Sequence, residues 1–265
     1  MPNMGSGIAD YLRIHAVGDW TPQAVRVRQV GSSRRLVPEI EQLVDAAWAQ
    51  ALARPEVRLF DGPMCRMESW NAMPTLLEIA LSQTSYKPFL GTNLAHPELA
   101  DQYGRDVMAN PVGVSPALET ADGFLLLGRR NSSVAYYPER VHPFAGALEP
   151  KDDGNLFAAV RRELFEELSL TDSQIVEIRC TGIAEDIALR QPELIFRVKS
   201  TATRSQIESQ LHTEEHRTSV AIEARPHAVA LALIDRELTP VAIASLLLWG
   251  RISFGLGWYE AACVR

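Results

Sequence analysis

Residues 162–170 read Arg-Glu-Leu-Phe-Glu-Glu-Leu-Ser-Leu and bring three carboxylates close together in the sequence. Glu163, Glu166 and Glu167 stand at offsets of 0, +3 and +4, so on an α-helix they share one face. Like charges in that arrangement repel and weaken an isolated helix by about 0.2–0.5 kcal/mol per pair. A bound divalent cation would offset this repulsion, and the neighbouring Arg162 offers a partial alternative. On composition alone, a solvated helix face is the more frequent explanation of such a stretch.

The segment before this helix continues the pattern. Gly146 leads a loop that carries Glu149 and Asp152, and nine residues separate Asp152 from Arg162. Together the two segments resemble the Nudix box, written G-x5-E-x7-R-E-U-x-E-E-x-G-U, where U is aliphatic. Gly146 matches the first glycine, and the second half matches at Arg162, Glu163, Leu164, Glu166, Glu167 and Leu170. This resemblance makes the solvated-face explanation the weaker one.

The chain departs from the box at three places. Asp152 replaces the first glutamate, Ser169 replaces the last glycine, and the spacer is two residues longer, which we place at 153–154. The insertion enlarges a loop that is normally tight but leaves the helix intact. Ser169 reduces the backbone freedom available after the helix. We therefore expect working chemistry with altered loop geometry.

The resemblance implies a Nudix fold, an α/β/α sandwich in which the box forms a strand–loop–helix–loop that holds divalent metal. Carboxylate oxygens suit Mg²⁺, with Mn²⁺ as an alternative. Glu163 and Glu167 are expected to share one ion, while Glu166 holds a second ion or binds through water. Because Glu166 and Glu167 are adjacent, they point about 100° apart on a helix.

The remaining box residues are expected to act on these carboxylates. Arg162 is better placed to pair with a box carboxylate than to contact substrate. Either Glu149 or Asp152 can orient it, and neither is expected to be a firm metal ligand. Gly146 is expected to permit a close approach of the backbone.

A resemblance upstream of the box extends to the substrate. Residues 59–63, 84–93 and 110–130 look like segments of the animal UDP-glucose pyrophosphatases of the Nudix superfamily. Physical reasoning alone favours 83–93 as a loop that its aromatic side chains anchor to the core, and the resemblance shifts the balance towards a ligand role. The substrate-binding residues that it implies are Phe60, Tyr86, Lys87, Phe89, Gly91, Thr92 and Asn93.

The catalytic base is less well defined by the sequence. Glu214 and Glu215 occupy a polar loop of the kind that supplies a carboxylate in many Nudix enzymes, and Glu214 is our choice of base. The alternative is that both side chains are ordinary surface charges. His142 and His216 are expected to be structural or solvent-facing rather than metal ligands. Glu193 opens a strand after a proline and faces either the site or water. The predicted catalytic set is Glu163, Glu166, Glu167, Arg162 and Glu214.

The sequence predicts an α+β protein. We expect an N-terminal α+β region at 1–107 that contributes to substrate binding, packed on a Nudix domain at 108–265. Within these regions we expect a loose lead-in at 1–22, strands at 57–60, 64–70, 75–81 and 228–234, and helices at 38–53, 97–108, 156–168 and from Thr239 onwards.

Composition limits the partners. The chain has 265 residues and a formal charge of −7, which argues against a nucleic-acid partner. The longest apolar run, 241–249, is too short to span a bilayer. Three cysteines without CxxC spacing and no apparent signal peptide favour a cytoplasmic protein. The oligomeric state is left open.

The first functional hypothesis is Mg²⁺-dependent hydrolysis of a UDP-sugar, of the UDP-glucose or UDP-galactose type, to UMP and a sugar 1-phosphate by metal-activated water. Two alternatives remain. One is a Nudix pyrophosphatase for another nucleoside diphosphate derivative, such as ADP-ribose, a dinucleoside polyphosphate or a coenzyme. The other is a Nudix module that binds a nucleotide sugar without cleaving it.

Overall fold

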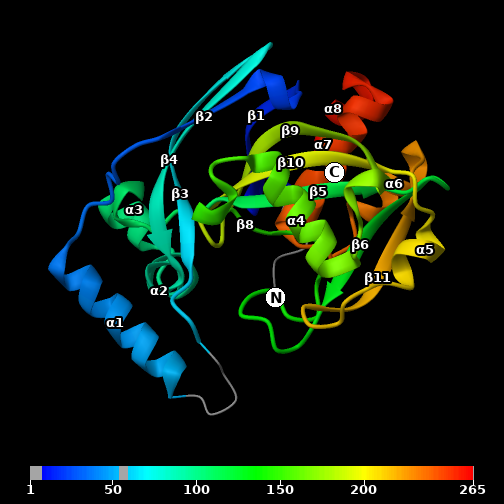
Figure 1. The fold of residues 1–265 in the computed structure, drawn as a ribbon. Helices are drawn as coiled ribbons and strands as arrows, with labels where there is room; N and C mark the ends of the chain where they lie inside the picture. The colour runs from blue at the N-terminus through cyan, green and yellow to red at the C-terminus, as the bar shows by residue number, and fades with distance from the viewer. Residues whose placement is uncertain (1–7, 54–58, 265) are drawn as a thin grey trace.

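The computed structural model describes residues 8–53 and 59–264 and is built on two β-sheets (Figure 1). The large sheet has eight strands in the order β1-β9-β10-β5-β6-β11, with β7 beside β6 and β8 beside β5. Its strands are β1 (Leu12–Trp20), β5 (Gly113–Glu119), β6 (Phe124–Arg130), β7 (Val141–His142), β8 (Gly146–Ala147), β9 (Ile175–Asp186), β10 (Gln191–Ser200) and β11 (His216–Glu223). The small sheet has the order β2-β4-β3, with β2 (Val25–Gln29), β3 (Pro63–Met73) and β4 (Leu76–Ser85).

Helices cover both faces of the large sheet. The helices are α1 (Pro38–Leu52), α2 (Tyr86–Phe89), α3 (Leu99–Tyr103), α4 (Leu156–Leu168), α5 (Arg204–Glu208), α6 (Pro226–Ala232), α7 (Pro240–Phe254) and α8 (Leu256–Cys263). Alternate residues of a strand point to opposite faces. In β6, Leu126 packs in the core beneath α4, whereas Leu125 and Leu127 pack in the core beneath α7. The expected α/β/α arrangement is therefore present.

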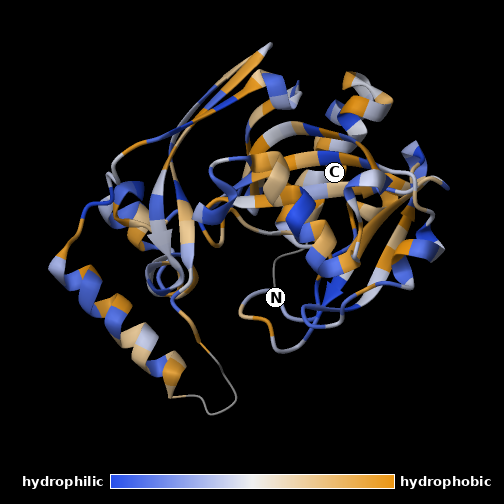
Figure 2. Ribbon diagram, in the orientation of Figure 1, coloured by the Kyte–Doolittle hydropathy of each residue, from blue (hydrophilic) through white to orange (hydrophobic). Residues whose placement is uncertain are grey.

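The small sheet shares a core with the large one. Leu77, Ile79 and Leu81 of β4 belong to the same buried cluster as α4. By contrast, α1 stands at the edge of the molecule, where Ile40 and Val44 are its buried residues, and hydrophilic and hydrophobic residues are mixed along it (Figure 2). None of the helices in the described part of the chain is long and apolar enough to cross a membrane.

Several element predictions are confirmed. The box helix has the predicted bounds, α1 differs from its prediction by one residue, and Thr239 caps α7 by accepting a hydrogen bond from Ala242 N. The strands expected at 64–70 and 75–81 correspond to most of β3 and to the first part of β4. Of the strand expected at 57–60, residues 57–58 lie outside the described residues, and 59–60 are not in a strand.

Three predictions are wrong. The lead-in contains β1, an edge strand of the large sheet that pairs antiparallel with β9. Residues 228–234 are mostly helical in α6, which begins with Pro226 in its first turn. The segment expected as a loop at 83–93 forms the end of β4, then α2, then one π-helical turn at Leu90–Leu94.

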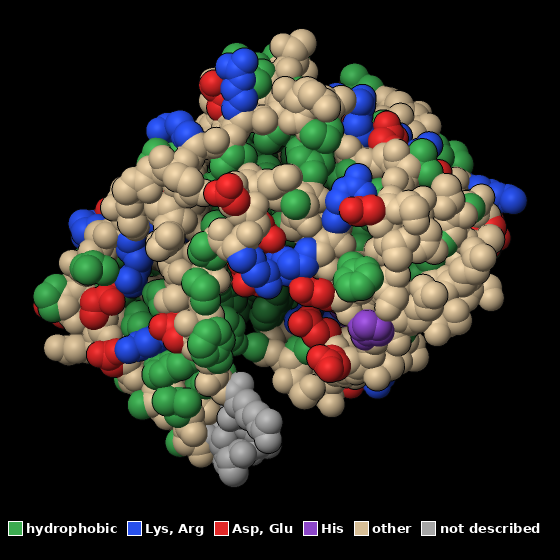
Figure 3. All heavy atoms as spheres, in the orientation of Figure 1, with side chains coloured by type: hydrophobic (Ala, Val, Ile, Leu, Met, Phe, Trp, Pro, Cys, Tyr) green, Lys and Arg blue, Asp and Glu red, His purple; other side chains and the backbone are tan. Residues whose placement is uncertain are grey.

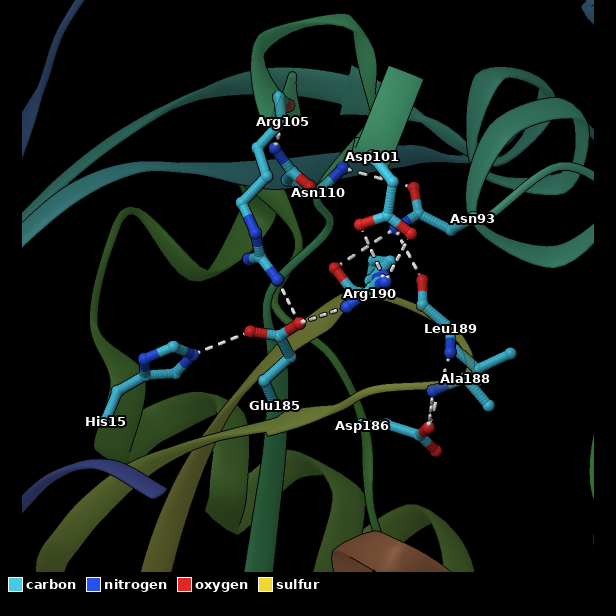
Figure 4. Close-up of polar contacts among 10 residues, drawn as sticks. All are labelled: His15, Asn93, Asp101, Arg105, Asn110, Glu185, Asp186, Ala188, Leu189 and Arg190. Atoms are coloured by element: carbon cyan, nitrogen blue, oxygen red, sulfur yellow. Dashed lines mark hydrogen bonds and ion pairs between the residues drawn. The ribbon is translucent and has the colours of Figure 1, made fainter. Parts of the chain in front are cut away.

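One buried carboxylate ties the N-terminal part of the chain to the large sheet. Glu185 of β9 has a side chain with 0% exposure, and it accepts contacts from three separate segments. His15 Nε2 lies 2.7 Å from its carboxylate, Arg105 donates a hydrogen bond to it, and Arg190 Nη1 lies 3.9 Å away (Figure 4). The division of the chain at 107/108 stays a prediction, but these contacts cross it.

Candidate active site

The box loop is organised around Arg162. Its Nε and Nη2 each donate to one carboxylate oxygen of Asp152, both at 3.0 Å, and Nη2 also donates to the carbonyl oxygen of Ala147 at 3.2 Å. Asp152 closes a capping box with Glu149 around the 3₁₀ turn Pro150–Asp152. Burial alone would lower the pKa of Arg162, but Asp152 and Glu163 hold it above its usual range. The pairing predicted for Arg162 is thus present, with Asp152 as its main partner.

Gly146 provides the room for the first box carboxylate. A Cβ atom added at Gly146 would overlap the carboxylate of Glu163. Arg162 Nη1 donates to Glu163 Oε1 at 2.7 Å and to Glu166 Oε2 at 3.2 Å. The glycine at this position therefore allows Glu163 to lie against the β8 backbone, as the close approach expected from the sequence requires.

The departures from the box pattern alter the backbone on both sides of α4. Ser169 adopts a left-handed conformation, with φ of 51°, and its N–H donates to Phe165 O at 2.9 Å. Before the helix, the inserted Asp153 and Gly154 are both left-handed, with φ of 50° and 71°. Asn155 then caps the helix by accepting from Ala158 N at 3.0 Å. The helix itself is intact.

Two of the three box glutamates are buried among other carboxylates. Burial raises the pKa of Glu163 to about 7; Arg162 opposes that shift, and the charges of Glu166 and Glu215 add to it. Burial, then Glu215 and Glu163, raise the pKa of Glu167 well above its usual value. Glu166 is exposed. Acidic and basic side chains gather around a hollow in the middle of the face that carries α4 (Figure 3).

This carboxylate group fits a divalent cation by its chemistry. Glu167 Oε2 is buried and has no hydrogen-bond partner among the described residues, so it is available as an oxygen ligand. A cation would also relieve the repulsion that raises the two pKa values. No three His, Cys, Asp or Glu side chains of residues 8–53 and 59–264 form a ready-made metal cluster. Metal binding therefore requires the glutamates to turn towards the ion.

Of the two carboxylates in the polar loop before β11, Glu215 is the one whose charge acts on the box glutamates. Glu215 is close enough to raise the pKa values of both Glu163 and Glu167. Both side chains are exposed in the turn before β11, and neither makes a hydrogen bond or ion pair within the described chain. Their carbonyl oxygens both accept from Asn131. Glu215 is therefore a second candidate base beside the predicted Glu214.

Both histidines are structural rather than solvent-facing. His142 Nδ1 lies 2.9 Å from Thr239 Oγ1. His216 is fully buried against Phe144, with ring centres 5.0 Å apart, and its Nδ1 is 3.6 Å from Glu167 Oε2. Burial lowers the pKa of His216 to about 3, so this ring is neutral at physiological pH.

Four of the seven predicted substrate-binding residues are buried in the protein. They are Phe89, Gly91, Thr92 and Asn93. Thr92 Oγ1 donates to Pro88 O at 2.7 Å, and Asn93 Nδ2 donates to Leu189 O at 2.9 Å. The Asn93 side chain thus holds the segment against residues 189–190. A direct role in substrate binding stays a prediction.

The other three predicted residues are more accessible. Phe60 is 77% exposed. The Lys87 ammonium lies 2.5 Å from Asp45 of α1, and the Tyr86 ring contacts Trp48 edge-on at 6.4 Å. Lys87 and Tyr86 thus lie against α1, in the N-terminal part of the chain.

Two buried charged residues of this region were not assigned a role from the sequence. Arg130, 4% exposed, ends β6, and its guanidinium carbon lies 4.7 Å from the centre of the Tyr136 ring. Glu193 is buried, and Ser115 Oγ donates to it at 2.9 Å. Each is a charged residue at one end of an apolar strand sequence. That position was the sequence signal that could have identified these two residues.

Comparison with known proteins decides the family. A bovine protein, uridine diphosphate glucose pyrophosphatase NUDT22, is 30% identical over 205 residues, which cover 66% of this chain and 70% of that protein. The human protein of that name is 28% identical over 256 residues, covering 83% of this chain and 84% of its own. The chain belongs to the Nudix hydrolase superfamily. As a NUDT22-like member it is classed with the Nudix pyrophosphatases.

Other comparisons add little to this Nudix assignment. No family model matches the chain. The NUDIX domain of Shewanella oneidensis NrtR, solved with ADP ribose, is 16% identical, covers 60% of this chain and 99% of its own, and has a TM-score of 0.40.

Proposed function

We propose that this Nudix enzyme hydrolyses the diphosphate of a UDP-sugar, of the UDP-glucose or UDP-galactose type, to UMP and a sugar 1-phosphate with Mg²⁺ or Mn²⁺. The observation that carries the reaction type is the buried carboxylate group of α4, whose Glu167 Oε2 has no partner in the described chain. The name of the bovine and human relatives supports uridine as the nucleoside. We also propose a cytoplasmic location, supported by three free cysteines.

The proposed metal ligands are Glu163 and Glu167, with Glu166 binding directly or through water. A bound Mg²⁺ would neutralise the diphosphate and lower the pKa of the attacking water. Arg162, fixed by Asp152, orients Glu163 through its 2.7 Å hydrogen bond. Glu215 accepts the proton of the water as the new P–O bond forms and the bridging P–O bond breaks, releasing the sugar 1-phosphate and UMP.

The proposed substrate contacts fall into two groups. Phe60, Tyr86 and Lys87 are accessible and suited to contact uridine or its ribose. The buried Phe89, Gly91, Thr92 and Asn93 position that segment through their contacts with the protein. The second group is expected to affect binding indirectly.

The test is an assay of the purified protein with Mg²⁺ against UDP-, ADP- and GDP-sugars. UMP release confined to UDP-sugars supports the proposal. Equal turnover of all three, a preference for ADP-ribose, or tight binding without cleavage would each refute the stated specificity or activity.

Glu167→Gln tests the metal assignment within the same assay. We expect it to remove most activity, because a neutral amide is a weaker ligand for a divalent cation than a carboxylate, while the fold persists. Glu260→Gln makes the same chemical change on exposed α8 and is expected to retain full activity. Full activity in Glu167→Gln, with an unchanged melting curve, would contradict the assignment.

A further inference from the structure

Arg130 is a buried arginine that has no carboxylate partner within the described part of the chain. Its backbone N–H donates to Arg140 O at 2.9 Å, and it pairs with His216 in the register of β6 and β11. Arg66, which is buried to a similar degree, makes a 3.0 Å ion pair with Glu68. No Asp or Glu of residues 8–53 and 59–264 lies within ion-pair distance of Arg130, and its Nε has no hydrogen-bond partner there. An uncompensated buried charge is strongly unfavourable.

Arg130 lies on the strand pair next to the box carboxylates, because it pairs with His216 in the register of β6 and β11. Its positive charge opposes the raised pKa of Glu167 and adds to the lowering of the pKa values of His142 and His216. Glu167 and His216 are themselves 3.6 Å apart. Arg130 therefore flanks the carboxylate group from the β6–β11 side.

The loop that supports Arg130 is held in a strained conformation. Tyr136 lies beneath the guanidinium at 4.7 Å and contacts Phe89 edge-on at 6.4 Å. The next residue, Tyr137, has φ of 50°, and its hydroxyl donates to Asp186 Oδ2 at 2.7 Å. Left-handed backbone at a bulky residue persists only where surrounding contacts fix it. The Tyr136 ring is thus a fixed platform for the guanidinium.

We propose that Arg130 binds a phosphoryl group of the substrate diphosphate, opposite the box carboxylates. A planar guanidinium presents two parallel N–H donors to phosphate oxygens, and the Tyr136 ring holds that plane in place. This inference rests on the proposed function because a diphosphate is its ligand, but it requires neither uridine nor a sugar. The substrate anion supplies the missing partner of the buried charge.

Arg130→Met and Arg130→Lys test the proposal, with Arg129→Met as the matched control. Arg129 is the neighbouring residue on β6 and pairs with Glu237 at 2.5 Å. Binding of inorganic pyrophosphate, UDP and uridine is measured by calorimetry with Ca²⁺ present, together with the melting temperature of each variant. Uridine lacks phosphate and controls for contacts made by the base and ribose.

We expect Arg130→Met to raise the Kd for pyrophosphate and for UDP at least tenfold, which corresponds to about 1.4 kcal/mol. Its melting temperature should equal or exceed that of the wild type, because the substitution removes an uncompensated buried charge. Arg130→Lys should lose part of the affinity, since ammonium lacks the planar fork. Arg129→Met should leave both Kd values unchanged.

A lower melting temperature with unchanged Kd values would show that Arg130 only supports the loop, and it would overturn the proposal. If Arg130→Met does not fold, Arg130→Lys decides: Kd values within twofold of the wild type overturn it. Failure of the proposed function is seen separately. Loss of pyrophosphate binding in the Arg130 variants upholds this inference even if UDP-sugars are not cleaved.

Discussion

Glu193→Gln should remove a pH-dependent weakness of the fold. Glu193 lies buried in β10 and pairs with Gly113 of β5. A Cβ atom added at Gly113 would overlap the Glu193 carboxylate. Burial raises the pKa of Glu193 from 4.5 to about 8; the hydrogen bond from Ser115 opposes that shift and the charge of Asp186 adds to it. At neutral pH the folded protein therefore keeps this carboxyl protonated, whereas the unfolded chain does not.

The direction of this pH dependence follows from the number of protons that the folded and unfolded states bind. Between pH 4.5 and about 8 the folded state binds one more proton at Glu193 than the unfolded state, so stability falls as pH rises through that window. The slope is about 1.4 kcal/mol per pH unit, or about 3 kcal/mol between pH 4.5 and 7. Glutamine resembles the neutral acid in shape and keeps an oxygen that accepts from Ser115, but it does not ionise.

The assay is the melting temperature of wild type and variant from pH 5 to 8. The variant should be close to the wild type at pH 5 and more stable by about 6–12 °C near pH 7–8, at about 2–4 °C per kcal/mol. Taking the difference cancels the titration of all other groups. Glu260→Gln, an exposed site, should show no such trend. A difference between Glu193→Gln and wild type that does not change with pH would refute a raised pKa at Glu193.

Two further substitutions test the box. Gly146→Ala should reduce activity at least tenfold and lower the free energy of unfolding in urea by about 1–3 kcal/mol, because the added methyl displaces Glu163. A wild-type kcat in this variant would contradict the contact. Ser169→Gly should raise the free energy of unfolding by up to about 1 kcal/mol, because glycine relieves the left-handed backbone. The loss of the hydrogen bond to His212 reduces this gain, and a clear loss of stability would show that the hydrogen bond matters more.

The fold was predictable where local signals agree. The box helix has an apolar stripe along its length, and α7 has Thr239 and Pro240 at its start. The apolar run at 228–234 is too short for its periodicity to separate a strand from a helix, and it was assigned to the wrong type. In β1, pairing with β9 decides the conformation, and a strand partner far along the chain leaves no local signal.

In the candidate site, too, the residues brought together by local spacing were predictable and those brought together by strand pairing were not. Glu163, Glu166 and Glu167 lie on one helix, so their spacing alone brings them together. Glu215 and Arg130 both act on Glu167 by their charge. Glu215 directly precedes β11 and Arg130 ends β6, so the pairing of these two strands brings them near it. The spacing of residues along the sequence does not reveal how these two strands pair. The choice between Glu214 and Glu215 as the base therefore stays a prediction.

The departures of the box loop from the family pattern belong together. Asp152 has one methylene fewer than the glutamate it replaces, yet it binds Arg162 through both oxygens at 3.0 Å. The two left-handed residues that follow, Asp153 and Gly154, let the chain turn back before Asn155 caps α4. A Cβ atom at Gly154 would lie 3.1 Å from Val27 Cγ1 of β2, so the turn packs against the small sheet. The longer loop thus joins the N-terminal sheet to the box while the shorter carboxylate keeps Arg162 in place, and neither change disturbs the helix that carries Glu163, Glu166 and Glu167.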